Sequence, residues 1–470
     1  MATSVDNSPA NQSDAPHTEA SRSKRRRWPA VLVGLFVILS IAVAVTPLVV
    51  DVTPPPQNGP MLWPYLTQDT EFEGLAGPSA DAPVPSAEGI AAILEPHFSG
   101  MSGDVAVSVR DGLTGEELYN RSAQEPLIPA SSTKAVTAAA ALAVWGSGYR
   151  IPTRVVAGTE AGQVVLIAGG DVTLTREGAG YYEDAGTLAD LAEQVVDQLG
   201  SAPTTLIVDT SIFPDDPVAP GVDRVDIADG YTAELTPFMV DGGRTEPTAP
   251  NYGQRSQDPT KAAADHLADL LGGATVEYGT ADPQAAELGV VYSPTMQRMV
   301  EAAMVTSDNL LADALARQAA LGWGAEASFA GGAAATLEIL ESLGISTEGV
   351  ALYDGSGLST DNLLTASLLS QVVTVAVSDE VRVTGLAASF AVAGYSGSLE
   401  RRFGEEDPAH GEVRAKTGTL SQVSSLTGMV LDADGRWLTF SFIINGKNNL
   451  YEAERVLDKA ATALIDCGCS

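Results

Sequence analysis

A serine and a lysine three positions apart, Ser131 and Lys134, open an alanine-rich apolar segment. If residues 132–145 form a helix, the two side chains share a face and can touch. Burial lowers the pKa of a lysine, and its neutral amine can then act as a general base toward a serine nucleophile. The free N–H groups at a helix start suit a developing oxyanion. The pair therefore predicts nucleophilic catalysis by Ser131.

The same spacing also occurs where no chemistry is expected. Residues 21–24 read Ser-Arg-Ser-Lys inside a polar tail, and Ser131 or Ser132 could act only as a helix N-cap. The second copy differs in its setting, because the segment around Lys134 consists of Ala, Val, Leu, Thr and Trp. A lysine there is costly unless it is paired or functional.

A second motif, Ser307-Asp308-Asn309, interrupts a helical pattern over residues 294–319. With a locally extended backbone, Ser307 and Asn309 would point into one cleft, where Ser307 could shuttle a proton and Asn309 could donate to a substrate carbonyl. A plain helix cap is the alternative. Residues 360–362, Thr-Asp-Asn, have a similar pattern before an apolar helix and are interpreted as a cap.

A third motif, Lys416-Thr417-Gly418-Thr419, lies on a predicted strand. Lys416 and Gly418 share a face because strand side chains alternate. Gly418 would let a substrate backbone lie against the strand and pair with it. Lys416 and the nearby hydroxyls would then hold a carboxylate. An edge strand protected by a lysine is the alternative.

Each motif is weak alone, but their order and setting agree. They follow one another as Ser-x-x-Lys at a helix start, Ser-x-Asn between helices and Lys-Thr-Gly on a late strand. This trio is typical of penicillin-binding proteins and class A β-lactamases. Two of the chain's six lysines fall inside it. We therefore expect the three motifs to form one active site.

The composition excludes several other classes of function. With 60 Asp+Glu against 26 Lys+Arg, the formal charge is −34, which argues against binding a nucleic-acid backbone. Two cysteines, Cys467 and Cys469, and four scattered histidines argue against a metal centre. A Ser-His-Asp hydrolase is disfavoured because no histidine lies in a motif.

The N-terminal region predicts the compartment. Residues 1–27 are interpreted as a cytoplasmic basic tail, 28–50 as a transmembrane anchor or signal segment, and 51–85 as a Pro-rich stalk. The apolar run over 30–50 is long enough to cross a bilayer, and the basic cluster before it favours a body outside the membrane. A cleaved secretory signal is the alternative. The expected location is thus the cell membrane, through one N-terminal helix, or the exterior.

The patterning of the body predicts an α+β fold, with an antiparallel sheet built from both chain ends and helices packed on it. Residues 155–290 have a different texture and are interpreted as one or two inserted accessory domains between 86–154 and 291–470. Strands are expected at 104–109, 117–120, 164–168, 205–208, 413–417, 422–431 and 437–444. Helices are expected at 132–145, 187–199, 260–271, 294–319, 331–343, 363–377 and 449–465.

The sequence resembles the penicillin-interacting serine D-Ala-D-Ala peptidases, and most of all their class C low-molecular-mass group, the penicillin-binding protein 4 family of peptidase S13 type. Residues 166–171 resemble its Gly-x-Gly-Asp turn, 353–359 match its Asp-Gly-Ser-Gly-Leu-Ser run, and 393–399 resemble its Gly-x-x-Gly-Thr-Leu segment, with Ser398 for Thr. The resemblance covers about residues 87–466. It implies a β-lactamase/transpeptidase-like fold, an antiparallel sheet with helices on both sides, carrying an inserted domain.

The resemblance also implies the activity, that of a serine-type D-Ala-D-Ala carboxypeptidase which acts on peptidoglycan stem peptides and is acylated by β-lactams. Endopeptidase activity on the same peptides stays open at this point. No metal or cofactor would be required. The alternatives are a β-lactamase, which would turn penicillin over rapidly, and a non-catalytic envelope protein that binds β-lactams or muropeptides. The implied roles are Ser131 as nucleophile, Lys134 as general base, Ser307 as proton relay, Asn309 as peptide-positioning group, Lys416 and Thr417 as carboxylate-binding groups with Thr419 nearby, and the N–H groups of Ser131 and Thr419 as oxyanion hole.

Overall fold

The computed structural model describes residues 79–214, 216–247, 252–378 and 380–467. The expected tail over 1–27, the anchor or signal segment over 28–50 and most of the stalk lie outside these residues. Among the described residues, no helix is long and apolar enough to cross a membrane.

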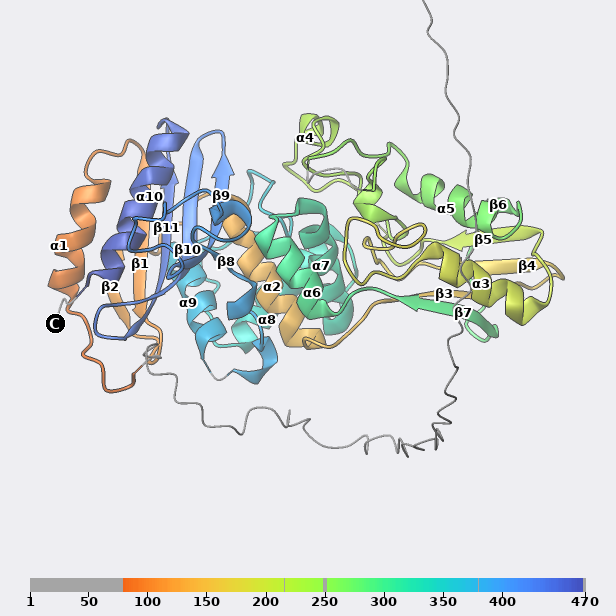
Figure 1. The fold of residues 1–470 in the computed structure, drawn as a ribbon, viewed down its shortest axis with the longest axis horizontal. Helices are drawn as coiled ribbons and strands as arrows, with labels where there is room; N and C mark the ends of the chain where they lie inside the picture. The colour runs from red at the N-terminus through yellow and green to blue at the C-terminus, as the bar shows by residue number, and fades with distance from the viewer. Residues whose placement is uncertain (1–78, 215, 248–251, 379, 468–470) are drawn as a thin grey trace, which may run out of the picture. The chain divides into compact units, whose positions relative to one another are not determined.

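The larger of two sheets has six antiparallel strands, in the order β2-β1-β11-β10-β9-β8 (Figure 1). Two of them come from the start of the described chain and four from its end, and β1 pairs with β11 along its whole length. The prediction of a sheet built from both chain ends is confirmed. The strands are β1 (Asp104–Asp111), β2 (Glu117–Arg121), β8 (Ala391–Val392), β9 (Arg414–Leu420), β10 (Val423–Leu431) and β11 (Trp437–Asn445).

Helices cover both faces of this sheet (Figure 1). The side chains of β11 alternate between the two faces, so each face needs a cover. Phe440, Phe442 and Ile444 are buried in the core with α1 (Ala87–Phe98) and α10 (Leu450–Ile465). Between them, Thr439, Ser441 and Ile443 face the side that carries α9 (Ala366–Val377), where Thr439 Oγ1 lies 2.7 Å from the Thr374 hydroxyl.

A layer of helices lies on the α9 side of the sheet. At its centre is α2 (Thr133–Trp145), whose residues from Thr133 to Leu142 are all buried, as the all-round apolar sequence predicted. It contacts α6 (Met296–Val305), α7 (Asn309–Trp323), α8 (Phe329–Ser342) and α9. The predicted interruption of the helical pattern over 294–319 is confirmed, because α6 ends at Val305 and α7 begins at Asn309.

The second sheet has five strands, in the order β6-β5-β4-β3-β7, and its pairings are partly parallel and partly antiparallel. Its residues all lie between α2 and α6 in the chain, and α3 (Leu188–Leu199) and α5 (Pro259–Leu270) share its hydrophobic core. A short helix, α4 (Arg224–Ala228), follows β5. The strands are β3 (Pro152–Ala157), β4 (Gln163–Ile167), β5 (Thr205–Asp209), β6 (Thr275–Tyr278) and β7 (Glu287–Tyr292).

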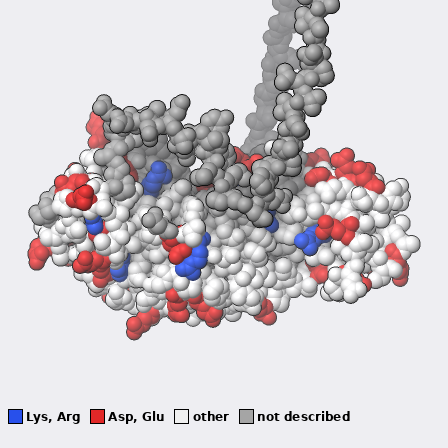
Figure 2. All heavy atoms as spheres, turned by 90° about the horizontal axis from the view of Figure 1, so that it is seen from below, with Lys and Arg blue, Asp and Glu red and all other residues white. Residues whose placement is uncertain are grey.

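Acidic side chains are scattered over the face shown in Figure 2, and the basic groups between them are small. This distribution follows from the formal charge of −34. A surface of this sign repels polyanions.

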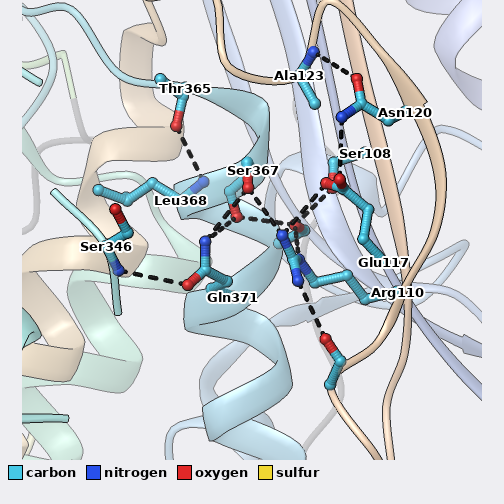
Figure 3. Close-up of polar contacts among 12 residues, drawn as sticks. Ser108, Arg110, Glu117, Asn120, Ala123, Ser346, Thr365, Ser367, Leu368 and Gln371 are labelled. Atoms are coloured by element: carbon cyan, nitrogen blue, oxygen red, sulfur yellow. Dashed lines mark hydrogen bonds and ion pairs between the residues drawn. The ribbon is translucent and has the colours of Figure 1, made fainter. Parts of the chain in front are cut away.

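Polar contacts tie α9 to β1 and β2 (Figure 3). The Arg110 guanidinium donates to Ser370 Oγ at 3.0 Å, to Ser367 Oγ at 2.8 Å and to Glu117 Oε1 at 3.2 Å. Ser108 Oγ lies 2.8 Å from Ser370 Oγ. Because the Arg110 side chain is only 12% exposed, these partners replace the water that it lost on folding.

We expect Arg110→Met to lower the free energy of unfolding by about 1–3 kcal/mol, because Glu117 and the two α9 serines lose a buried donor. Denaturant unfolding measures the change. The matched control is Arg298→Met, which breaks an ion pair with Glu301 whose two side chains are 56% and 42% exposed. That loss should stay below about 0.5 kcal/mol. Equal losses in the two variants would contradict a structural role for the Arg110 cluster.

Candidate active site

The three predicted motifs meet at one end of α2. A cavity of about 310 Å³ is lined by Ser131, Ser307, Asn309 and Thr419, together with residues of the segment between β5 and β6. Residues of three motifs that are far apart in the sequence thus share one cavity, as the combined motifs predicted.

The predicted nucleophile and base are in contact. Ser131 lies in a 3-10 turn, Ala130–Ser132, directly before α2, and Lys134 lies in the first turn of that helix. Lys134 Nζ is 3.0 Å from Ser131 Oγ and 2.7 Å from Asn309 Oδ1. Ser132 points elsewhere, because its hydroxyl lies 2.8 Å from Ser425 Oγ. The helix start therefore directs Ser131, and not its neighbour, toward the lysine.

The environment of Lys134 suits a base. Its side chain is 1% exposed, and this burial lowers its pKa to about 8. The negative charges of Asp313, Asp354 and Asp308 oppose the shift without cancelling it. A neutral amine is therefore accessible near neutral pH.

Ser307 sits in a left-handed turn between α6 and α7, with φ of +59°. Ser307 itself is therefore not extended, but Asp308, which separates it from Asn309, is extended, with φ of −66° and ψ of 114°. Asp308 is the N-cap of α7, accepting from the Leu311 N–H at 3.1 Å, so the chain must turn sharply just before it. Asp308 is also held by the buried Arg244, at 3.2 Å, and by the Tyr182 hydroxyl, at 2.9 Å. Those contacts hold Ser307 in a conformation that a non-glycine residue rarely adopts.

Lys416 is a residue of β9, and its side chain is fully buried. Its amine donates to Ser307 Oγ and to the Thr417 carbonyl, both at 2.9 Å. Burial, followed by the positive charges of Lys134 and Arg402, lowers its pKa well below the usual value. Lys416 therefore connects the Lys-Thr-Gly strand to the Ser-x-Asn turn.

The two threonine hydroxyls of β9 are hydrogen-bonded to side chains from other segments of the chain. Thr417 Oγ1 donates to Ser398 Oγ at 2.7 Å, and Thr419 Oγ1 donates to Glu454 at 3.2 Å. Since β8 pairs only with Arg414 and Ala415, no described strand pairs with the motif residues along that edge. A substrate backbone can add to this open edge.

Gly418 is required for a reason that the sequence did not show. We predicted that it leaves room for a substrate. In the structure, a Cβ at this position would lie 2.3 Å from Ser425 Oγ and 2.6 Å from the Pro129 carbonyl oxygen. Glycine thus lets β9 approach the turn that carries the nucleophile.

The model of the D-Ala-D-Ala carboxypeptidase 3 (S13) family matches this chain over residues 90–268 and 250–464. The chain belongs to this family. The match includes all three motifs and both sheets.

Known S13-like proteins agree with this assignment. The chain is 39% identical over 413 residues to a carboxypeptidase of Mycobacterium tuberculosis, covering 84% of this chain and 87% of that protein. It is 35% identical over 458 residues to carboxypeptidase DacB of Mycolicibacterium smegmatis, covering 94% and 98%. The crystal structure of penicillin binding protein 4 from Haemophilus influenzae has a TM-score of 0.65 at 21% identity, over 78% of this chain and 98% of that one. That likeness shows a shared α+β fold.

Several residues at this S13 site were missed by the sequence analysis. Residues 360–362 do not cap a helix; the N-cap of α9 is Thr365, while Asn362 donates to Asp354 at 2.6 Å. The Ser356 carbonyl, 2.7 Å from Lys134 Nζ, was also not predicted. The Asp-Gly-Ser-Gly-Leu-Ser run over 354–359 was the only signal for this loop, and it gave a resemblance without a role.

Proposed function

We propose that this member of the S13 family is a serine-type D-Ala-D-Ala carboxypeptidase that acts on peptidoglycan stem peptides and is acylated by β-lactams. The observation that carries the proposal is the contact of a buried lysine amine with Ser131 Oγ at the edge of a cavity. Membership of the family and carboxypeptidase relatives at 35–39% identity support it.

Acylation follows from the contacts of Lys134. The neutral amine takes the proton of Ser131 Oγ as the new Oγ–C bond forms to the carbonyl carbon of the penultimate D-alanine. The backbone N–H groups of Ser131 and Thr419 would stabilise the oxyanion. When the C–N bond breaks, the proton reaches the departing amine through the Ser307 hydroxyl, which Lys416 holds at 2.9 Å. Water then hydrolyses the ester and restores Ser131.

The remaining motif residues would bind the substrate. Asn309 Nδ2 already donates to the Tyr231 carbonyl at 3.0 Å, so its other N–H can donate to a peptide carbonyl. Lys416 and Thr417 would bind the terminal carboxylate, with Thr419 nearby on the same face of β9 as Thr417. The open edge at Gly418 would pair with the peptide backbone.

A β-lactam would follow the same path, with its lactam C–N bond in place of the peptide bond. The penicillin binding protein 4 of Haemophilus influenzae has also been solved in complex with a β-lactam, and that structure has a TM-score of 0.62 to this chain. The β-lactamase and sensor alternatives have less support, because the two relatives compared above are named carboxypeptidases.

The testing experiment measures D-alanine release from a muramyl pentapeptide by the purified protein, before and after one equivalent of benzylpenicillin. We expect release that the antibiotic blocks, together with a stable penicilloyl adduct in the mass spectrum. Rapid recovery of the free protein would favour the β-lactamase. An adduct on a protein that never releases D-alanine would favour the sensor.

We also propose the chain organisation that the sequence predicts: 86–154 and 291–470 form the catalytic domain and 155–290 an insert, behind a tail over 1–27, an anchor or signal segment over 28–50 and a stalk over 51–85. The origin of all five strands of the second sheet in residues between α2 and α6 supports the insert. The body would work outside the membrane. Sequencing the N-terminus of the mature protein distinguishes an uncleaved anchor from a removed signal.

A further inference from the structure

Lys134 has one partner that comes from none of the three motifs. Its amine lies 2.7 Å from the Ser356 carbonyl oxygen, as it does from Asn309 Oδ1. A neutral amine has two N–H donors and one lone pair. When these two acceptors take both donors, the lone pair is left for the Ser131 hydroxyl, 3.0 Å away. The Ser356 carbonyl therefore helps to orient the base.

The loop that carries the Ser356 carbonyl is in turn held by a buried carboxylate, that of Asp354, which is 3% exposed. Asp354 Oδ1 accepts from the N–H groups of Gly357 and Ser356, at 2.7 and 3.2 Å, and from Asn362 Nδ2 at 2.6 Å. Asp354 Oδ2 accepts from the Ser359 N–H at 2.7 Å and from Ser356 Oγ at 2.9 Å. Five donors directed at two oxygens indicate an ionised carboxylate, which only accepts.

The loop around Asp354 is also fixed from outside. The Gly355 N–H donates to Asp313 Oδ1 at 2.9 Å, and the Gly355 carbonyl accepts from Thr137 Oγ1 at 2.7 Å. Gly357 has φ of +80°, and a Cβ there would lie 1.9 Å from the carbonyl oxygen of Ala130, next to the nucleophile. The loop thus lies against α7, α2 and the nucleophile turn, and small shifts in it reach Lys134 directly.

We propose that Asp354 is a positioning residue for acyl transfer: its carboxylate folds residues 354–362 around itself and so sets the Ser356 carbonyl against the Lys134 amine. This inference rests on the proposed function, in which Lys134 is the base. An asparagine would serve less well, because it replaces one accepting oxygen by an NH2 group that faces other donors.

Asp354 also contributes charge to the site. The groups that face Lys134 are Asp354, Asp313 and Asp308, which favour its protonated form, and Lys416, which disfavours it. Burial raises the pKa of Asp313 well above its usual range. The negative charge next to Lys134 therefore comes more from Asp354 than from Asp313. Removing the charge of Asp354 should lower the pKa of Lys134 below its value of about 8. Because the neutral amine is the active form, the acid limb of the rate profile then moves to lower pH.

The test compares acylation of Ser131 by a fluorescent penicillin in the wild type and in Asp354→Asn, from about pH 5 to about pH 9. We expect the plateau rate to fall by about 10- to 100-fold, because the base is misaimed. The midpoint of the acid limb should fall by about one pH unit. A lower rate with the wild-type midpoint would indicate a merely structural residue and overturn the proposal, as would an unchanged profile.

Asp361→Asn is the matched control, since Asp361 is an exposed carboxylate of the same loop. Its backbone N–H, which the substitution keeps, donates to Ser359 Oγ at 3.3 Å. It should keep the wild-type profile. If Asp354→Asn does not fold, Ser356→Ala decides, because it removes one donor to Asp354 and keeps the carbonyl. We expect its plateau rate to fall by about threefold or more, and a wild-type rate would overturn the proposal. If the wild type takes up penicillin without releasing D-alanine, the proposed carboxypeptidase activity is contradicted. The comparison of penicillin acylation rates between wild type and variants still tests the role of Asp354.

Discussion

Ser131→Ala is expected to abolish D-alanine release and penicillin uptake together, with a loss of about 10⁴-fold or more. Ser131 Oγ is the atom that Lys134 Nζ contacts at 3.0 Å, and alanine offers no atom to acylate. Both reactions form an ester on the same Ser131 oxygen, so they should disappear to the same extent. Coupled D-alanine detection and gel fluorescence after labelled penicillin measure the two losses.

The adjacent serine provides the control. Ser132 is fully buried and its hydroxyl is paired with that of Ser425, away from the lysine. Ser132→Ala should therefore still take up penicillin, with a modest loss of stability of about 1 kcal/mol from the missing hydrogen bond. Penicillin uptake that persists in Ser131→Ala, or that disappears in a folded Ser132→Ala, would move the nucleophile away from Ser131.

The sequence allowed the site to be predicted where function depends on local spacing. Ser131 and Lys134 are three residues apart on one helix start, and a lysine among alanines has few structural reasons to be there. The burial of α2 also followed from its own residues. The positions of β9, β10 and β11 also followed from their own residues. Each of these features depends on a short stretch of chain.

Features set by distant contacts could not be predicted in this way. Ser307 adopts its left-handed turn because Asp308 binds Arg244, which lies 64 positions earlier. No residue near Ser307 in the sequence indicates that Arg244 is the partner. The Ser356 carbonyl reaches Lys134 across 222 positions. A backbone carbonyl has no side-chain signature, so only the fold reveals that it orients the base. Gly418 was noticed, but one of the neighbours that require a glycine there is the Pro129 carbonyl, which lies just before the nucleophile turn and far from β9 in the sequence.

The proposed role of Lys134 as a base requires a side chain that can lose its proton, and Lys134→Arg tests this requirement directly. Arginine keeps the positive charge and several donors but cannot lose its proton in the accessible pH range. If Lys134 acts as the base, acylation should fall by about 10²- to 10⁴-fold, and the acid limb of the wild-type profile should disappear. Stopped-flow measurement of penicillin uptake against pH records both effects.

Lys416→Arg separates the role of charge from the role of the base. Lys416 is equally buried, but it donates to Ser307 and to a backbone carbonyl, and neither contact requires a neutral amine. Arginine should preserve part of that function, with a loss of about tenfold from the larger side chain in a packed site. Similar losses in the two variants would mean that Lys134 also acts mainly through its charge. The proton of Ser131 would then have to leave by a route other than the amine 3.0 Å away.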